Sequence, residues 1–287
     1  MSALPRPAVL ALTSLVMAAF AANSVLARLA LVATETGAAS FTALRLVAGA
    51  AMLALVLRLR PPAGRAEGPR GDWVSAAALF AYAAAFSFAY LSLATGTGAL
   101  LLFGAVQLTM IGWGLVQGER MGVVRWLGIA LAMAGLVVLV APGVEAPPAG
   151  AAALMALSGA AWGVYSLRGR GVGAPVAASA GNFWRAAVFG LGLLGVAAVW
   201  PGFAPRTDGA GVSYAVLSGA VTSGLGYVLW YRVLPALRAA SAATVQLSVP
   251  VLAALGGVAF VGEDVTVRLL LATAATLGGI ALVVRAR

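Results

Sequence analysis

Aromatic, amide and hydroxyl side chains recur at helical spacing inside long apolar stretches of this sequence. Residues spaced i, i+3, i+4 and i+8 share one face of a helix. Two such faces are Phe20, Asn23, Ser24 and Arg28, and Trp162, Tyr165, Ser166 and Arg170. A ring beside an amide or a hydroxyl can stack on a flat apolar group while the polar atoms hydrogen-bond. These residue types predict a binding site for a small amphipathic molecule.

Two aromatic stripes in other apolar stretches extend the candidate site. They are Tyr82, Phe86 and Tyr90, and Tyr227, Trp230 and Tyr231. Tyr and Trp also gather at both surfaces of a membrane, so Tyr90 and Tyr231, near the ends of their stretches, fit an interfacial belt as well as a cavity. Tyr82, Trp162 and Tyr165 lie deeper, where a hydroxyl or indole N–H needs a partner, and fit a polar cavity or simple packing. The substrate-binding candidates are Phe20, Asn23, Ser24, Tyr82, Phe86, Trp162, Tyr165, Ser166, Tyr227 and Trp230.

Arg45 and Arg185 are the two basic residues well inside apolar stretches. An arginine at the centre of a membrane helix costs roughly 2.5–3.5 kcal/mol on insertion scales, so each should face a cavity or a partner. Each also lies near enough to one end of its stretch to snorkel to the surface. They are equally candidates for a structural anchor and for a contact with a substrate carboxylate or a gate. Pro250 interrupts the ninth stretch and is a candidate hinge or a structural kink.

The composition is that of a membrane protein. Hydrophobic residues make up 62% of the 287 and charged residues only 9%, too few for the surface of a soluble domain. Cysteine and histidine are absent, which excludes disulfides, thiolate or imidazole chemistry and the usual zinc or haem ligand sets. No metal and no cofactor is expected. The net charge of +10 does not indicate nucleic-acid binding, because the arginines form no single basic face or tail.

Ten stretches are long enough to cross a membrane as helices, which takes about 20 mostly apolar residues. They are residues 8–30, 38–58, 73–93, 97–117, 123–141, 150–168, 176–199, 211–233, 239–261 and 266–284. If the N-terminus is cytoplasmic, thirteen arginines lie on that side: Arg6, Arg58, Arg60, Arg65, Arg70, Arg120, Arg125, Arg168, Arg170, Arg232, Arg238, Arg285 and Arg287. Only Arg28, Arg206 and Arg268 lie on the other side. This asymmetry predicts an all-α integral membrane protein with both termini in the cytoplasm.

The sequence also repeats itself. The matches are Phe20 with Trp162, Ser24 with Ser166, Arg28 with Arg170, Arg45 with Arg185, Tyr90 with Tyr231, and Gly118-Glu119 with Gly262-Glu263. They divide the chain into a first five-helix repeat, residues 1–145, and a second, residues 146–287. Because five spans is an odd number, the second repeat must be inverted. Such repeats place a binding site at their interface near the bilayer midplane and allow one half to rock against the other.

Acidic residues are confined to span ends and loops: Glu35, Glu67, Asp72, Glu119, Glu145, Asp208, Glu263 and Asp264. A proton-coupled carrier usually needs a group that changes protonation within the membrane, so facilitated diffusion fits better. The sequence has no Gly-rich phosphate loop for direct ATP drive. A membrane-embedded hydrolase would lack its histidine or its paired aspartates, so no enzymatic activity is expected. A channel lined by Ser, Thr and Tyr remains an alternative.

Several short segments resemble a known family. The ten-span plan, Phe20, Arg45, Trp162-Gly163 and the Gly-Glu pairs after spans four and nine resemble the drug/metabolite transporter (DMT) superfamily, and within it the EamA-type exporters. Residues 23–28 (Asn-Ser-Val-Leu-Ala-Arg) and 40–46 (Ser-Phe-Thr-Ala-Leu-Arg-Leu) are most similar to the YddG-type aromatic amino acid exporters. The resemblance implies a ten-helix basket whose central cavity opens alternately to each side. The four-span multidrug members rely on a glutamate in their first helix, where this chain has only Asn23 and Ser24.

The function expected is therefore export of small amphipathic metabolites, with aromatic amino acids as the first expectation. A broad-specificity metabolite or drug exporter of the same fold is the main alternative, ahead of a channel. The expected partners are a small-molecule substrate and the lipid bilayer, with no nucleic acid and no obligatory protein partner. The expected location is a bacterial-type inner membrane.

Overall fold

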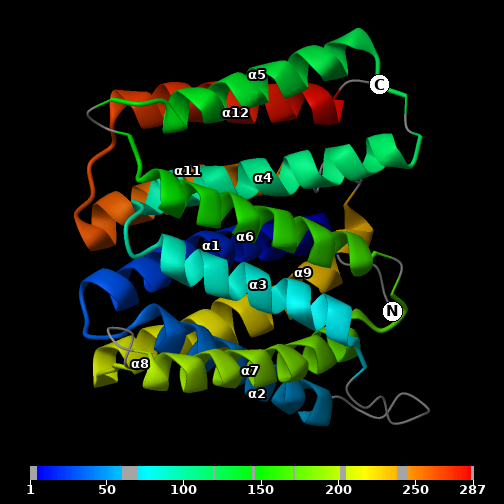
Figure 1. Cartoon of the computed structure of the whole chain (residues 1–287). Helices are drawn as coiled ribbons and strands as arrows, with labels where there is room; N and C mark the ends of the chain where they lie inside the picture. Colours follow the sequence, from blue (N-terminus) through cyan, green and yellow to red (C-terminus); the bar gives the residue numbers. More distant parts are fainter. Residues whose placement is uncertain are drawn as a thin grey trace.

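The computed structural model describes residues 5–59, 70–118, 120–143, 146–170, 172–200, 205–237 and 245–285. Expectations for Arg60, Arg65, Glu67, Glu119, Glu145, Arg238 and Arg287 lie outside the described residues. Helices account for the regular secondary structure of these ranges, which hold no strand, and the all-α prediction is confirmed for this part of the chain. The helices run roughly antiparallel in one bundle (Figure 1).

The first half of the chain forms five helices: α1 (Arg6–Val32), α2 (Ala38–Leu59), α3 (Trp73–Ala89), α4 (Thr95–Val116) and α5 (Val123–Val140). The second half begins with α6 (Ala149–Arg168) and α7 (Pro175–Val199). A composite helix follows, made of α8 (Gly209–Val216), the π-helix η1 (Leu217–Leu225), α9 (Gly226–Val233) and the 3₁₀ turn η2 (Leu234–Ala236). The last elements are α11 (Ser248–Gly256), the π-helix η3 (Gly257–Val261) and α12 (Val267–Arg285).

Within the described ranges, eight helices are long and apolar enough to cross a membrane, counting Gly209–Ala236 as one. Two shorter apolar helices, Trp73–Ala89 and Ser248–Val261, stand where the third and ninth spans are expected. The third ends early because Tyr90 to Leu93 form a turn. The expected span 239–261 begins outside the described residues, and Pro250 lies in the first turn of α11. Val245 and Gln246 are helical and Leu247 also has helical backbone angles, so the irregularity lies about one turn before Pro250, where a proline leaves a carbonyl without its helical partner. The role of Pro250 as a hinge stays a prediction.

Two aspartates outside the spans fix the starts of α3 and α8. Asp72 accepts a hydrogen bond from the Ser75 N–H at 2.9 Å, and Asp208 accepts one from the Gly211 N–H at 2.7 Å. Burial alone would raise the pKa of Asp72, but hydrogen bonds from Ser75 and the Arg168 guanidinium lower it below its ordinary 3.8. Backbone hydrogen bonds from Gly211 and Glu35 lower the pKa of Asp208. Both carboxylates therefore remain charged far below neutral pH.

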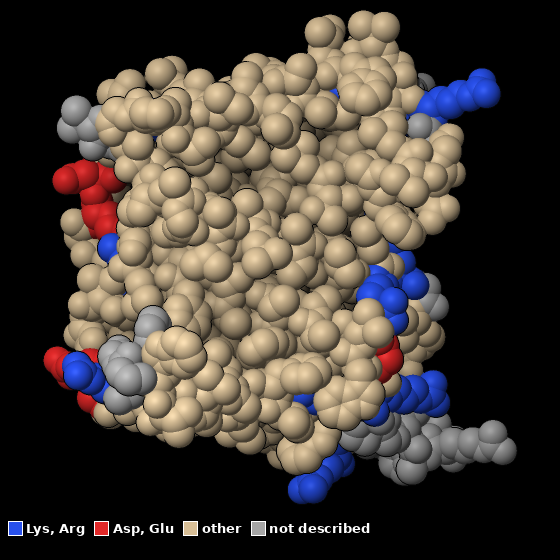
Figure 2. Space-filling model, in the orientation of Figure 1, with Lys and Arg blue, Asp and Glu red and all other residues tan. Residues whose placement is uncertain are grey.

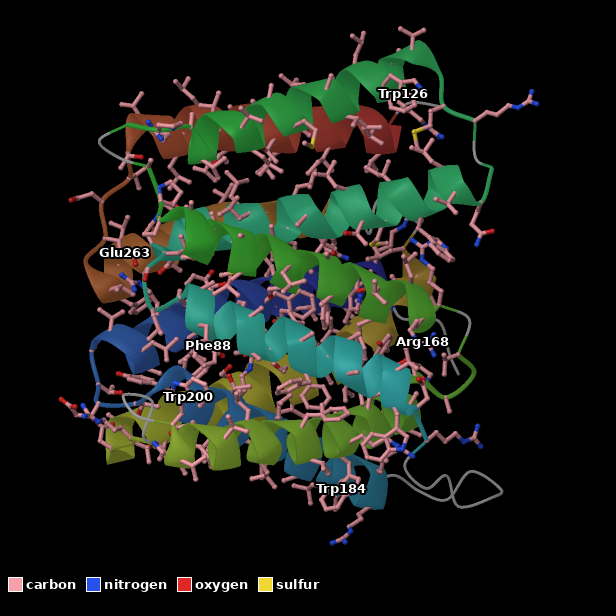
Figure 3. All side chains as sticks on the ribbon, viewed as in Figure 1. Phe88, Trp126, Arg168, Trp184, Trp200 and Glu263 are labelled. Atoms are coloured by element: carbon pink, nitrogen blue, oxygen red, sulfur yellow. The ribbon has the colours of Figure 1, made fainter. Side chains whose placement is uncertain are left out.

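The outer surface between the two ends of the bundle is apolar. Large side chains such as Leu10, Val137 and Leu271 are exposed there, as lipid contact requires. Figure 2 shows a broad tan band with the charged side chains gathered at its two edges. Five of the seven tryptophans are exposed on the outside: Trp73, Trp113, Trp126, Trp184 and Trp200. Figure 3 shows Trp184 pointing away from the bundle.

The two ends of the bundle differ. The start of α1 and the end of α12 lie at the same end, which we call the terminal end (Figure 1). Arg168 lies at this end, and Glu263 lies at the opposite one, which we call the distal end (Figure 3). Most arginines visible in Figure 2 are at the terminal end. The start of α1 and the end of α12 therefore face the same side of the bundle, and the assignment of that side to the cytoplasm stays a prediction.

Helices of the two halves pack on each other throughout. The most extensive partners are α5 with α12, α3 and α4 with α6, and α2 with α7 and η1. Two examples show how glycines let backbones touch. A Cβ on Gly128 of α5 or on Gly279 of α12 would collide with the other's carbonyl oxygen, and a Cβ on Gly219 of η1 would collide with the Arg45 carbonyl of α2. Each of these contacts joins a helix from residues 1–145 to one from residues 146–287.

Candidate substrate cavity

A cavity of about 550 Å³ lies among α1, α3, α4, α6 and α9, between the two halves of the chain. Nine of the ten substrate-binding candidates line it: Phe20, Asn23, Ser24, Tyr82, Trp162, Tyr165, Ser166, Tyr227 and Trp230. The tenth, Phe86, is fully buried one turn from Tyr82 and does not line the cavity. The helical spacing in the sequence thus brings nine candidates from four spans to one place, and their role in binding stays a prediction.

Trp162 is the centre of the aromatic wall. Its ring centroid lies 4.9 Å from that of Tyr82, 5.1 Å from that of Tyr227 and 5.4 Å from that of Tyr165. Offset and tilted rings at these distances attract one another and leave faces for a further ring. Trp162 and Trp230 are the two tryptophans that line the cavity, whereas the other five are exposed on the outside. The wall is suited to holding a planar apolar group.

Asn23 is the centre of the polar wall. Its Oδ1 accepts hydrogen bonds from Ser218 Oγ at 2.7 Å and Thr222 Oγ1 at 3.2 Å. Both donors belong to the π-helix η1 and lie four residues apart, so they face the same side of the helix. Gly219 lets this segment lie directly against α2, and π-helical turns are frequent at functional sites. Two hydroxyls of η1 therefore hold one cavity side chain.

Arg45 and Arg185 differ sharply in their surroundings, although the sequence pairs them. Arg45 is only 3% exposed and lies behind Asn23 and Tyr82, outside the cavity lining. Its guanidinium carbon lies 4.9 Å from the centroid of Phe86, which gives that candidate a role in packing against the charge. Arg185 donates to the carbonyls of Arg70 and Gly181 near the terminal end and does not line the cavity. These contacts are those of a structural anchor, and the role of Arg185 stays a prediction.

Several cavity residues were not among the candidates. They include Gln107, Met110, Thr222, Ser223, Tyr231 and Gln246. Gln107 and Gln246 both occur in the tripeptide Val-Gln-Leu and are amides in otherwise apolar segments, a signal that could have found them. The hydroxyls of η1 carried no such signal, because Ser and Thr are common at helix contacts in membranes.

The cavity reaches the terminal end and is closed at the distal end. Its lining continues to Gly169, Arg170, Val172 and Pro175 between α6 and α7, and to Leu234 and Pro235 of η2. At the distal end, Arg28 pairs with Glu263, and the fully buried Tyr90 donates its hydroxyl proton to the Thr95 carbonyl oxygen at 3.2 Å. None of these four residues lines the cavity. The structure is that of a one-sided pocket reaching about halfway through the bundle.

The arrangement offers stacking and hydrogen bonding and nothing that indicates bond-making chemistry. Across the described ranges no three His, Cys, Asp or Glu side chains group as metal ligands would. A helical membrane protein with a one-sided, partly polar cavity between two halves has the architecture of a carrier. The profile of the EamA-like transporter family matches residues 150–285.

An uncharacterised protein of Pseudomonas aeruginosa is 56% identical over 285 residues, covering 99% of this chain and 97% of its own length. A solved crystal structure of 21% identity covers 96% of this chain and 99% of its own, with a TM-score of 0.66, and shows that the fold is shared. The second half of the chain, residues 150–285, therefore belongs to the EamA-like transporter family, within the drug/metabolite transporter superfamily. The chain is a multi-pass membrane protein of a family of transporters.

Proposed function

We propose that this protein exports aromatic amino acids by facilitated diffusion through alternating access. The observation that carries the proposal is the pairing of an aromatic wall around Trp162 with a polar wall around Asn23 in one cavity. An aromatic amino acid has the same two parts, a planar ring and a polar end. Few polar groups in a largely apolar pocket are typical of specific small-molecule sites.

The open side of the cavity indicates the side from which this conformation would load substrate, whereas in facilitated diffusion the substrate gradient sets the direction of net transport. The lining reaches the terminal end, and the arginine-rich side of a membrane protein normally faces the cytoplasm. With that orientation, this conformation would load substrate from the cytoplasm of a bacterial-type inner membrane. Reporter domains fused to either end of the chain test the orientation. Cytoplasmic reporters must be active at both ends, and an external reporter active at either end would contradict the proposal.

The main test is uptake into liposomes that contain the purified protein. A screen of the twenty amino acids, each with and without a pH gradient, should show saturable uptake that favours Phe, Tyr and Trp. Counterflow, in which unlabelled substrate inside accelerates entry of labelled substrate, separates a carrier from a channel. Equal uptake of all twenty, or none, would remove the assignment of substrate.

A broad-specificity exporter is the second candidate, and the extent of the cavity favours it. Apolar residues such as Leu102, Val106 and Met110 continue the lining beyond the aromatic wall. Flexible Met side chains adapt to different partners. Aromatic compounds without an amino acid end should inhibit the uptake of labelled phenylalanine if the exporter has broad specificity. If none of them inhibits this uptake, the exporter is specific for aromatic amino acids.

A further inference from the structure

Hydrogen-bond donors without acceptors gather on the polar wall, with a positive charge behind them. Arg45 Nη2 donates to Asn23 Oδ1 at 3.3 Å and approaches the Tyr82 hydroxyl oxygen at 3.5 Å. A guanidinium can only donate, so the Asn23 atom that faces it has to be the oxygen. Ser218 Oγ can donate to the same oxygen at 2.7 Å, which agrees with this orientation. The amide group of Asn23 is therefore fixed.

The donors of this wall belong to side chains that line the cavity. The Asn23 amide nitrogen donates one hydrogen to the Tyr82 oxygen at 3.3 Å, and its second hydrogen remains available. Because the Tyr82 oxygen accepts from Asn23 and Arg45, its own proton must be donated elsewhere. No acceptor among the described residues receives that proton, and both side chains line the cavity. An N–H and an O–H thus stand side by side without acceptors.

The charge of Arg45 is not balanced within the described part of the chain. No carboxylate there pairs with it, and its buried Nη1 has no hydrogen-bond partner among the described residues. Besides the neutral oxygens of Asn23 and Tyr82, the rings of Phe41, Tyr82 and Phe86 face the guanidinium, with centroids 4.9–5.8 Å away. A ring face stabilises a cation less strongly than an anion does. A negative group in the cavity beside Asn23 and Tyr82 would lower the cost of burying this charge.

We propose that Asn23 and Tyr82 form a carboxylate-binding site at the inner end of the cavity. Arg45 does not touch the substrate and is a positioning residue, which fixes the Asn23 amide and makes this wall positive. The ring of the substrate lies against Trp162, whose centroid is 4.9 Å from that of Tyr82. The substrate class is an aromatic ring joined by a short linker to a carboxylate. This inference rests on the proposed function for the place of the site and names the group that the substrate must carry.

Binding of two matched probes to the purified protein in detergent tests the site without transport. 3-Phenylpropionate and 3-phenylpropionamide have the same shape and differ in charge, and neither is an amino acid. Binding is followed by quenching of tryptophan fluorescence and by equilibrium dialysis. The carboxylate should bind roughly 10- to 100-fold more tightly, the usual gain from hydrogen bonds to a charged group. Equal binding, or tighter binding of the amide, would overturn the proposal.

Three substitutions identify the source of the preference. Tyr82→Phe removes one donor and should lower affinity for the carboxylate by about tenfold, with little change for the amide. Asn23→Asp replaces the donor by an anion that pairs with Arg45, and should abolish the preference. Arg45→Gln should reduce the preference and Arg45→Lys should restore part of it. Tyr214→Phe, which removes a hydroxyl from α8 outside the cavity, is the matched control and should leave both affinities unchanged.

Two outcomes separate a binding role from a structural one. If Arg45→Gln lowered the unfolding temperature and left the ratio of the two affinities unchanged, Arg45 would be purely structural and the proposal would fail. If amino acids were transported but neither probe bound, the carboxylate site would fail and the proposed function would stand. If the carboxylate probe bound more tightly than the amide but no amino acid were transported, the carboxylate site would stand and the proposed function would fail.

Discussion

Arg28 Nε and Glu263 Oε1 lie 2.9 Å apart in an ion pair that joins α1 to the segment after η3 at the distal end. The Arg28 side chain is 15% exposed and the Glu263 side chain 14%. Glu263 also accepts the Thr95 N–H at 2.7 Å, and Arg28 donates to the Tyr90 carbonyl at 2.8 Å. Elements from both halves are therefore held together by one carboxylate and one guanidinium, on the side where the cavity is closed.

Removing this ion pair should favour a conformation open at the distal end. Glu263→Gln keeps the shape and deletes the charge, and a loss of about 1 kcal/mol corresponds to roughly a fivefold change in population. The chain has no cysteine, so a Ser24→Cys variant carries a single thiol in the cavity. In the Glu263→Gln background a membrane-impermeant maleimide added from the distal side should modify this thiol several-fold faster.

The neighbouring Asp264 provides the control for this experiment. It is exposed, and no ion pair holds it within the described residues. Asp264→Asn should leave the labelling rate at its original value. Equal rates for Glu263→Gln and Asp264→Asn would show that the ion pair does not keep the distal end closed.

Loss of the central ring of the aromatic wall should weaken substrate binding. Trp162→Ala removes a ring that three others surround, and should raise the KM for aromatic amino acid uptake by about tenfold or more. Trp184→Ala removes the same side chain from the outer face of α7, where it is 66% exposed, and should leave KM unchanged. Both variants must elute as folded protein in size-exclusion chromatography. An unaltered KM in Trp162→Ala would exclude the aromatic wall from the site.

A methyl group on Gly219 should destabilise the protein. Its Cβ would meet the Arg45 backbone, which cannot yield as a flexible side chain does, and overpacking of this kind costs about 1–3 kcal/mol. The melting temperature of Gly219→Ala in detergent should fall. Gly192 lies in α7 with open space around it, so Gly192→Ala should melt at or above the original temperature, since alanine favours a helix. Equal melting temperatures would contradict the close contact between η1 and α2.

Transport should be nearly independent of pH between 6 and 7.5. The chain has no histidine, and the pKa values of Asp72 and Asp208 are below the ordinary 3.8. A carboxylate with a lowered pKa stabilises the fold above its unfolded pKa, and that stability is lost only as the pH falls through the lowered value. The stability that these two carboxylates contribute is therefore lost only below about pH 4. Liposome uptake at equal internal and external pH measures this, and a severalfold change across the range would point to proton coupling.

The sequence predicts which residues share a helical face, because the helical period alone decides which side chains point in the same direction. Phe20, Asn23 and Ser24 lie on one face of α1, and that face lines the cavity. The difference between Arg45 and Arg185 could not be predicted, because depth depends on which rings and carbonyls neighbouring helices bring to each position. The register of the hydrogen bonds in η1 was equally hidden, since the residues of Leu217–Leu225 would also suit an α-helix.

The close glycine contacts between α5 and α12 and between η1 and α2 limit which parts of the molecule can move separately. Gly128 and Gly279 lock α5 to α12, and Gly219 locks η1 to α2, with backbone against backbone. Such contacts lack the side chains whose rotamer changes let helices slide, so each pair should travel as a unit. Spin labels at the exposed Val137 of α5 and Leu282 of α12 should keep their separation when substrate is added, and a changed separation would contradict this. The bodies that part during transport would then each combine helices from residues 1–145 with helices from residues 146–287.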